Sequence, residues 1–399
     1  METAYIVDIV RTPIGKFGGT LASERPDDLA AHVIKALINR NPNFDKSLIE
    51  DVIFGAANQA GEDNRNVARM AGLMAGLPIE TGGVTVNRLC ASGLQSIMDA
   101  SRALMIGEGQ GYLAGGVESM SRAPFVMGKS ETAFGRKAEM YDTTIGWRFI
   151  NPKLAEMYHP YAMGETAENV ADQWKVSREA QDKFAHGSQL KFKAANDAGR
   201  FKEEITSYSI PQRKGDPLIF DKDEHPRLSS IEKLASLNPA FKKGGSVTAG
   251  NSSGINDGAA ASLIVNEATL KAFNLRPMAR VVSMAIAGVS PECMGVGPIP
   301  ATQKALKRAG ITASDIDLAE VNEAFAAQAI PCIKELGLNP DIVNVNGGSI
   351  AIGHPLGASG TRISATLLHE MQKRDNVKYG LATMCIGVGQ GAAIIFEKC

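Results

Sequence analysis

Two cysteines and one histidine of this chain lie in glycine-rich stretches where side chains could do chemistry. Cys90 lies in VNRLCASG, Cys385 in LATMCIGVGQG and His354 in NGGSIAIGHPLGASG. A thiol can accept an acyl group, a second thiol can move a proton, and an imidazole can activate the first thiol. These residue types together therefore indicate acyl transfer.

Each of the two cysteines has a local reason to be functional. The small residues that follow Cys90 open a helical pattern, and the free N–H groups at a helix start stabilise a thiolate. The pattern thus predicts that the pKa of Cys90 is lowered by about one unit or more. Cys385 precedes a turn that begins at Gly387 and exposes N–H groups able to bind an oxyanion.

Each loop also has a simpler explanation when it is taken alone. The histidine loop could bind phosphate, but it lacks the Lys-Ser/Thr of a Walker motif and the GxGxxG spacing. Asn322, in VNEAFAAQ, could be a turn or cap residue, and a lone cysteine is usually an inert buried residue. A cysteine–histidine pair could mean a protease, although no protease signature is present. Four such loops together favour a site.

The elements that must position these loops alternate between strand-like and helix-like patterns. This rhythm predicts an α/β fold with a mostly parallel sheet and helices on both faces. Ligands collect at the carboxyl ends of such strands, so we expect the four loops to face one cleft. Strands are predicted over 51–55, 83–88, 111–119, 341–348, 379–385 and 392–398, with one more within 315–323. Helices are predicted over 27–40, 91–107, 164–175, 178–199, 301–310 and 358–374, and residues 246–267 as a small-residue helix and strand.

The two ends of the chain resemble each other, which indicates a duplication. The letters ASG at 91–93 recur at 358–360, and IEDVIFGAA from Ile49 aligns with IDLAEVNEA from Ile316 at the same separation. The later copy has a longer loop before its helix, and His354 lies on that loop. The region between the copies is more charged and irregular, as is typical of a binding element. We predict a first half (1–120 plus 249–272), an inserted domain (121–248) and a second half (273–399).

Composition excludes several classes of protein. The 399 residues include 44% hydrophobic residues and carry a formal net charge of -1. Disorder, membrane insertion and broad nucleic-acid binding are therefore not expected. The start, METAYIVDIVRTP, lacks the features of a signal peptide, so a cytoplasmic location is expected. The five scattered cysteines form no zinc pattern, and no metal site is predicted.

At these residues the chain resembles the thiolase family over essentially its whole length. The motifs that carry the resemblance are VNRLCASGLQSI, GGVESMS, SVTAGNSSGINDGAA, GPIPA, EVNEAFAAQ, NVNGGSIAIGHPLGASG and GLATMCIGVGQG. The resemblance implies two duplicated βαβαβαββ halves in a five-layered αβαβα core, with a loop domain inserted in the first half. It also implies a homodimer or homotetramer that acts on acyl-CoA substrates, without a permanently bound cofactor.

The resemblance further implies a role for each matching residue. Cys90 would be the acyl-accepting nucleophile, His354 its base and an oxyanion donor, and Asn322 the residue that fixes a water as the other donor. Cys385 would be the acid and base at the acetyl α-carbon. The N–H groups of Cys90 and Gly387 would form a second oxyanion hole. The positions that match coenzyme A contacts are Leu154, Met163, Arg227, Leu237, Ala249, Gly250, Ser253, Ala324 and Phe325. Among these, Arg227 would contact the nucleotide end.

Two features bear on the substrate. Ala162 replaces a histidine that is typical of biosynthetic acetoacetyl-CoA thiolases, and DTTIGWRFINP resembles a segment of bacterial 3-oxoadipyl-CoA thiolases. A short dicarboxylic 3-oxoacyl-CoA is therefore the hypothesis, with Arg148 and Arg122 as candidate partners of its free carboxylate. The alternatives are an acetyl-CoA acetyltransferase that makes acetoacetyl-CoA, a non-catalytic carrier of acyl-CoA or lipid, and a ketosynthase. A ketosynthase is disfavoured because it usually has a second histidine at the position of Cys385.

Overall fold

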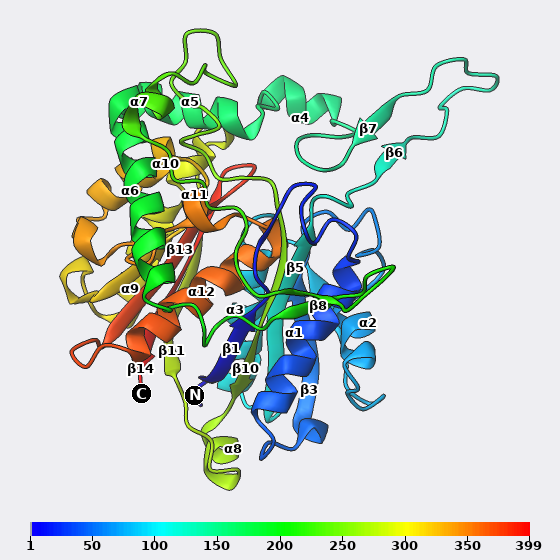
Figure 1. Ribbon diagram of the computed structural model, residues 1–399, viewed down its shortest axis with the longest axis vertical. Helices are drawn as coiled ribbons and strands as arrows, with labels where there is room; N and C mark the ends of the chain where they lie inside the picture. Colours follow the sequence, from blue (N-terminus) through cyan, green and yellow to red (C-terminus); the bar gives the residue numbers. More distant parts are fainter. Residues whose placement is uncertain (1) are drawn as a thin grey trace.

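The computed structural model describes residues 2–399, which form a mixed sheet with helices on both sides (Figure 1). The strand order is β12-β13-β14-β11-β1-β10-β5-β3-β4, with β2 (Gly15–Lys16) beside β10. The first half supplies β1 (Tyr5–Arg11), β3 (Ile49–Gly55), β4 (Val84–Val86), β5 (Gly111–Ser119) and β10 (Asn256–Val265). The second half supplies β11 (Ala279–Gly288), β12 (Leu318–Val321), β13 (Tyr379–Ile386) and β14 (Gln390–Lys398).

The prediction of a mostly parallel sheet is wrong. Only β3–β4, β3–β5 and β12–β13 are parallel pairs, and all the other pairs of the large sheet are antiparallel. The halves join where Tyr5 and Ile6 of β1 pair antiparallel with Arg280 and Ala279 of β11. The error has a physical cause, because a strand buried on both faces is continuously apolar whatever the direction of its neighbours.

Two further predictions about single elements are wrong. Residues 256–265 form one strand, β10, and no helix. Their side chains are small because β10 is buried along its whole length between α1 and α12. Residues 341–348 form no strand beyond one bridge between Ala319 and Val343. Asn344 has φ 46° there, and its side chain makes the pairing instead, accepting from the N–H of Val321 and donating to its carbonyl.

Helices and sheet halves form five layers. One outer layer is α1 (Pro26–Arg40) and α2 (Val67–Met74); α1 packs on β10 and β5, and α2 packs on β3. The central layer is α3 (Ser92–Met105) and α12 (Leu356–Gln372), which contact each other and strands of both halves. The other outer layer has α9 (Pro298–Ala309) on β11 and β14, with α10 (Ala326–Glu335) beside it. The αβαβα architecture is therefore present.

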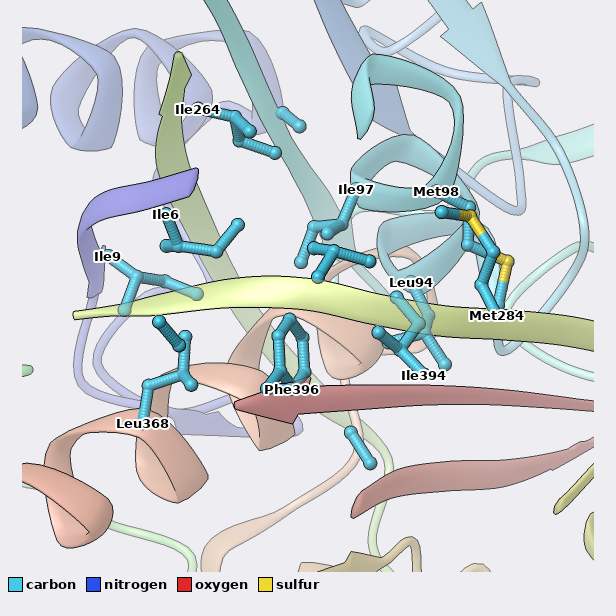
Figure 2. Packing of buried hydrophobic residues seen from close by; sticks show 14 of the residues in the cluster. Ile6, Ile9, Leu94, Ile97, Met98, Ile264, Met284, Leu368, Ile394 and Phe396 are labelled. Atoms are coloured by element: carbon cyan, nitrogen blue, oxygen red, sulfur yellow. The ribbon is translucent and has the colours of Figure 1, made fainter. Parts of the chain in front are cut away.

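The central layer contains a large apolar core. Figure 2 shows side chains of α3 and α12 packed against strands of both halves. Its labelled members are Ile6, Ile9, Leu94, Ile97, Met98, Ile264, Met284, Leu368, Ile394 and Phe396. This core fixes the starts of α3 and α12 relative to each other, and these starts follow the loops of Cys90 and His354.

The chain between β5 and β10 is a long excursion from the first half. It contains a hairpin of β6 (Phe125–Met127) and β7 (Met140–Asp142), which projects from the body of the molecule (Figure 1). Helices α4 (Pro152–Met157), α5 (Met163–Trp174), α6 (Arg178–Asp197) and α7 (Ile231–Ala235) follow, with the hairpin of β8 (Tyr208–Ile210) and β9 (Leu218–Phe220) between α6 and α7. The remaining helices are α8 (Glu267–Ala272) and α11 (Ser349–Ile352). Within residues 2–399, no helix has the length and apolar character to cross a membrane.

Candidate active site

Cys90 lies between β4 and α3, against the turn that joins β13 to β14. Leu89 has φ 46°, and its N–H donates to Asn87 Oδ1 at 2.8 Å, which bends the chain before the cysteine. The backbone N–H groups of Gly387 and of Cys90 itself favour the thiolate form of the Cys90 sulfur and so act to lower its pKa. The structure thus brings two widely separated residues of the sequence together at one thiol.

The prediction of a lowered Cys90 pKa is wrong. Burial raises the pKa of this thiol to about 11, and the negative charge of Glu118 raises it further. The N–H groups of Gly387 and Cys90 act in the opposite direction, but they do not outweigh the desolvation of a thiolate. Cys90 is therefore a neutral thiol at pH 7 and needs a base before it can attack.

His354 is the candidate for that base. The hydroxyl of Ser359 donates to Pro355 O at 2.7 Å, so its oxygen accepts a hydrogen bond from His354 Nδ1–H at 2.6 Å. This arrangement leaves Nε2 unprotonated, with its lone pair facing the amide nitrogen of Asn322. Burial, together with the positive charge of Arg362, lowers the pKa of His354 to about 3. The imidazole is consequently neutral and can accept a proton at Nε2.

Asn322 lies beside His354, and both are buried. Its Nδ2 is 3.4 Å from His354 Nε2, and its Oδ1 accepts from Ser349 Oγ at 2.5 Å. Arg362 Nη2 donates to the same hydroxyl at 2.5 Å. A continuous chain of polar groups therefore fixes the orientation of the Asn322 amide relative to the imidazole.

Cys385 lies near the end of β13 and belongs to the same region as Cys90. Burial raises its pKa well above the usual value for a thiol, and a negative charge on Cys90 raises it further. Its packing partners in one apolar cluster include Met163, Ala324 and Phe325. The thiol is thus surrounded by residues of the inserted region and of the loop that follows β12.

Direct backbone contact joins the helix after Cys90 to the helix after His354. Thr361 Oγ1 donates to Gly93 O at 3.0 Å, and a Cβ added to Gly93 would lie 2.7 Å from Gly357 O. Glycines at these positions allow α3 and α12 to begin side by side. The arrangement combines a thiol, a neutral imidazole and a second thiol, which suits acyl transfer.

Family models match almost the whole chain. The model of the thiolase N-terminal domain matches residues 4–268, and that of the thiolase C-terminal domain matches residues 275–398. The chain belongs to the thiolase family. It is accordingly an acyltransferase.

This thiolase is similar over its full length to several known proteins. It is 54% identical to a beta-ketoadipyl-CoA thiolase of Acinetobacter baylyi, and the match covers 100% of both chains. It is also 54% identical to the 3-oxoadipyl-CoA/3-oxo-5,6-dehydrosuberyl-CoA thiolase of Escherichia coli, again over 100% of both. The crystal structure of a Bacillus anthracis acetyl-CoA acetyltransferase superposes with a TM-score of 0.93 at 39% identity, covering 100% of this chain and 99% of the other.

Sequence reasoning missed the polar residues that support the site. Glu118 of β5 accepts hydrogen bonds from the N–H groups of Ala57, Asn58 and Gly357, at 3.0, 3.2 and 2.8 Å. Burial and the charge of Asp63 raise its pKa to about 7. The sequence did contain a signal for Glu118, because it is a charged residue in the otherwise apolar strand GYLAGGVES. Ser349, Ser359 and Arg362 had no such signal, because their partners are known only from the folded chain.

Four of the residues expected to contact coenzyme A line one pocket. This pocket of about 200 Å³ lies between the inserted region and the chain before β10; its lining includes Arg227, Leu237, Ala249 and Gly250. Arg227 Nη2 donates to Ala249 O at 2.5 Å, and burial lowers the pKa of this guanidinium.

The other expected contacts lie elsewhere. Ser253 donates its N–H to Ala324 O at 2.9 Å, close to Phe325 and Met163 in the region of Cys385. Leu154 lies in α4, and no contact places it in the pocket. Within residues 2–399, no group of three or more histidine, cysteine, aspartate or glutamate residues could hold a metal ion.

Proposed function

We propose that this thiolase uses coenzyme A to cleave 3-oxoadipyl-CoA into acetyl-CoA and succinyl-CoA. The observation that carries the substrate is the 54% identity over entire chains to thiolases named for 3-oxoadipyl-CoA. The match to the acetyl-CoA acetyltransferase structure is lower, at 39%. Condensation of two acetyl-CoA molecules to acetoacetyl-CoA is accordingly the second candidate.

In the first step, Cys90 takes the acyl group. His354 Nε2 accepts the proton of the Cys90 thiol, and the sulfur attacks the 3-keto carbon of the substrate. The imidazolium then has an Nε2–H that can donate to the keto oxygen, together with a water fixed by Asn322. The C2–C3 bond breaks, and the acetyl-CoA enolate takes a proton at C2 from Cys385. The succinyl group remains on Cys90 as a thioester.

In the second step, coenzyme A removes the succinyl group. Its thiol gives a proton to the Cys385 thiolate, and its sulfur attacks the thioester carbon. The N–H groups of Gly387 and Cys90, which favour negative charge at the Cys90 sulfur, would bind the oxyanion that forms on the thioester carbonyl oxygen. Cys90 leaves as a thiolate and recovers its proton from His354. All three side chains return to their starting states.

Binding and assembly are inferred at a coarser level. We infer that residues 121–248 form the domain that binds coenzyme A, with Arg227 near its nucleotide end. We further infer a cytoplasmic homodimer or homotetramer. Exposed apolar residues on the edge strand β4 and its approach (Val84, Ile79) and on the projecting hairpin (Phe125, Met127) support an assembly. Light scattering of the purified protein tests it, and a monomeric mass would contradict it.

The substitution Cys90→Ser tests the nucleophile. A serine hydroxyl is far less nucleophilic, so thiolysis of 3-oxoadipyl-CoA should fall by about 1,000-fold or more. Mass spectrometry should find a succinyl adduct on Cys90 in the native protein and none in the variant. Substantial thiolysis by the variant would remove Cys90 from this role. A native protein that binds acyl-CoA without any turnover would instead be a carrier, and preference for acetoacetyl-CoA would support the second candidate.

A further inference from the structure

The free carboxylate of a dicarboxylic acyl chain needs a cationic partner, and Arg122 cannot serve as one. Its Nε and Nη2 donate to the two carboxylate oxygens of Glu62 at 2.6 and 2.5 Å. Its Nη1 donates to Ser23 O at 3.3 Å. The two parallel N–H donors of this guanidinium are therefore already paired with the Glu62 carboxylate, and its positive charge is neutralised. The carboxylate of a substrate could not form the same two-bond pair. The structure thus removes one of the two arginines that the sequence offered.

Arg88, two residues before Cys90, is also engaged. Its Nε donates to Gln95 Oε1 at 2.7 Å, and its Nη1 donates to Gln390 Oε1 at 2.8 Å. These amides come from α3 and from the start of β14, and they hold the guanidinium between those two elements.

Arg148 differs from both of these arginines. It is half-buried in the segment between β7 and α4. Its Nη2 donates to Asn58 O at 3.1 Å, with Asn58 Oδ1 at 3.5 Å. Among residues 2–399, no carboxylate lies within ion-pair distance of Arg148, and its Nε and Nη1 donate to no protein atom. An arginine in this state can still bind a carboxylate through two parallel N–H groups.

The loop that Arg148 contacts lies between the loops of Cys90 and His354. Asn58 donates its N–H to Glu118, and the other carboxylate oxygen of Glu118 accepts from Gly357, three residues after His354. On the other side, Asn87 Nδ2, three residues before Cys90, donates to Ala57 O at 3.0 Å.

The segment of Arg148 is itself anchored at both ends. Asn58 Nδ2 donates to Thr143 O at 3.1 Å, and Trp147 Nε1 donates to Tyr161 O at 3.0 Å. The position of the guanidinium at this end of the site is therefore defined by the folded chain.

We propose that Arg148 binds the terminal carboxylate of the acyl chain and so selects dicarboxylic 3-oxoacyl-CoA substrates. In 3-oxoadipyl-CoA this carboxylate is three carbons beyond the keto carbon that Cys90 attacks. Arg148 is thus a specificity residue, and it takes no part in the proton transfers. This inference rests on the proposed function.

The test compares two substrates of equal chain length. 3-Oxoadipyl-CoA ends in a carboxylate and 3-oxohexanoyl-CoA ends in a methyl group, so the ratio of their kcat/KM values isolates the contribution of the carboxylate. In Arg148→Gln this ratio should fall roughly 10- to 100-fold, mainly because the dicarboxylic substrate binds more weakly and its KM rises. Arg148→Lys should retain part of the preference. The matched control Arg122→Gln should leave the ratio unchanged.

A second measurement is independent of carbon–carbon bond cleavage, because acyl transfer from an acyl-CoA to Cys90 breaks only the thioester bond and releases coenzyme A. Acylation of Cys90 by succinyl-CoA, followed by mass spectrometry against butyryl-CoA, should show the same loss of preference in Arg148→Gln. Turnover of 3-oxohexanoyl-CoA by each variant shows that it is folded.

The outcomes separate the two proposals. If the native protein prefers 3-oxoadipyl-CoA and Arg148→Gln leaves both ratios within about twofold of native, the role of Arg148 is overturned and the proposed function stands. If the native protein shows no preference for the carboxylate, the substrate assignment fails, and the inference fails with it.

Discussion

At the residue scale, the proposed nucleophile and the proposed base are both neutral in the free protein. The Cys90 thiol has a pKa of about 11 and the His354 imidazole a pKa of about 3, in each case chiefly because burial disfavours the charged form. A preformed thiolate–imidazolium pair is therefore not the resting state. In the proposed mechanism the thiolate forms only when the proton is transferred during attack, and the N–H groups of Gly387 and Cys90 favour that charged form of the sulfur.

This protonation state predicts how alkylation depends on pH. Because the raised pKa keeps Cys90 protonated below about pH 11, its thiolate fraction should increase about tenfold per pH unit across the neutral range. The rate of inactivation by iodoacetamide, measured from pH 6 to 10, should rise throughout. Acetyl-CoA should protect by acylating Cys90. A rate that levels off near pH 7 would show a lowered pKa instead.

Cys385 should be separable from Cys90 by isotope exchange. In Cys385→Ala, Cys90 should still acquire an acetyl group from acetyl-CoA, because the base His354 is intact. Exchange of the acetyl α-protons with deuterated water should be lost, since no group remains to move them. The native protein provides the control. Normal exchange in the variant would assign the proton transfer to another group.

At the element scale, the turn between α11 and α12 fixes the imidazole. Gly353 has φ 115°, and a Cβ there would lie 2.7 Å from Asn256 Cγ. Asn256 Oδ1 accepts from the N–H of His354 at 2.9 Å, so the glycine lets β10 hold the backbone of the histidine. The backbone of His354 is therefore held in place by a strand that lies almost a hundred residues away in the sequence.

Gly353→Ala should consequently impair both stability and catalysis. The strained backbone and the contact with Asn256 should cost about 1–3 kcal/mol of unfolding free energy, and displacement of the imidazole should lower kcat by about tenfold or more. Gly310→Ala is the matched control, because Gly310 has φ 70° at the end of α9 with open space around it. It should share the backbone strain and keep full activity. Equal kcat values for the two variants would contradict the positioning role.

At the scale of the whole molecule, the central layer determines how close the reactive loops lie. A Cβ on Gly360 of α12 would meet the backbone N of Leu94 in α3. Both helices are buried between the two sheet halves, so neither can move outward. Each half therefore contributes one helix to this closely packed pair, and these helices follow the Cys90 loop in the first half and the His354 loop in the second.

Gly360→Ala should destabilise the protein by about 3 kcal/mol, because the added methyl group overpacks this contact. Gly187→Ala makes the same change in α6, where nothing lies within 4 Å of the added atom. It should be neutral or stabilise by roughly 0.5–1 kcal/mol, since alanine favours a helix. Denaturant unfolding of both variants measures the difference. Similar stabilities would show that the α3–α12 contact is not tightly packed.

The sequence by itself determined the family, the duplication and most of the elements. The reactive residues lie in loops with distinctive local composition, and helices such as α1, α5 and α6 have clear apolar periodicity. These features depend on residues that are neighbours along the chain. Local pattern was sufficient to nominate Cys90, His354 and Cys385 as candidates, although it could not test their roles.

Only the tertiary structure decided strand direction, protonation and which arginine is paired with a carboxylate. The sequence could not show that β10 is antiparallel to its neighbours, or that Asn344 replaces a strand by side-chain hydrogen bonds. A helix start predicted a lowered pKa for Cys90, but desolvation by residues distant in sequence raised it. Likewise, the sequence could not show that Arg122 pairs with Glu62 whereas Arg148 donates to the carbonyl of Asn58. The burial of a side chain and the partner of a charged or polar group depend on which distant residues come into contact. Only the folded chain determines those contacts.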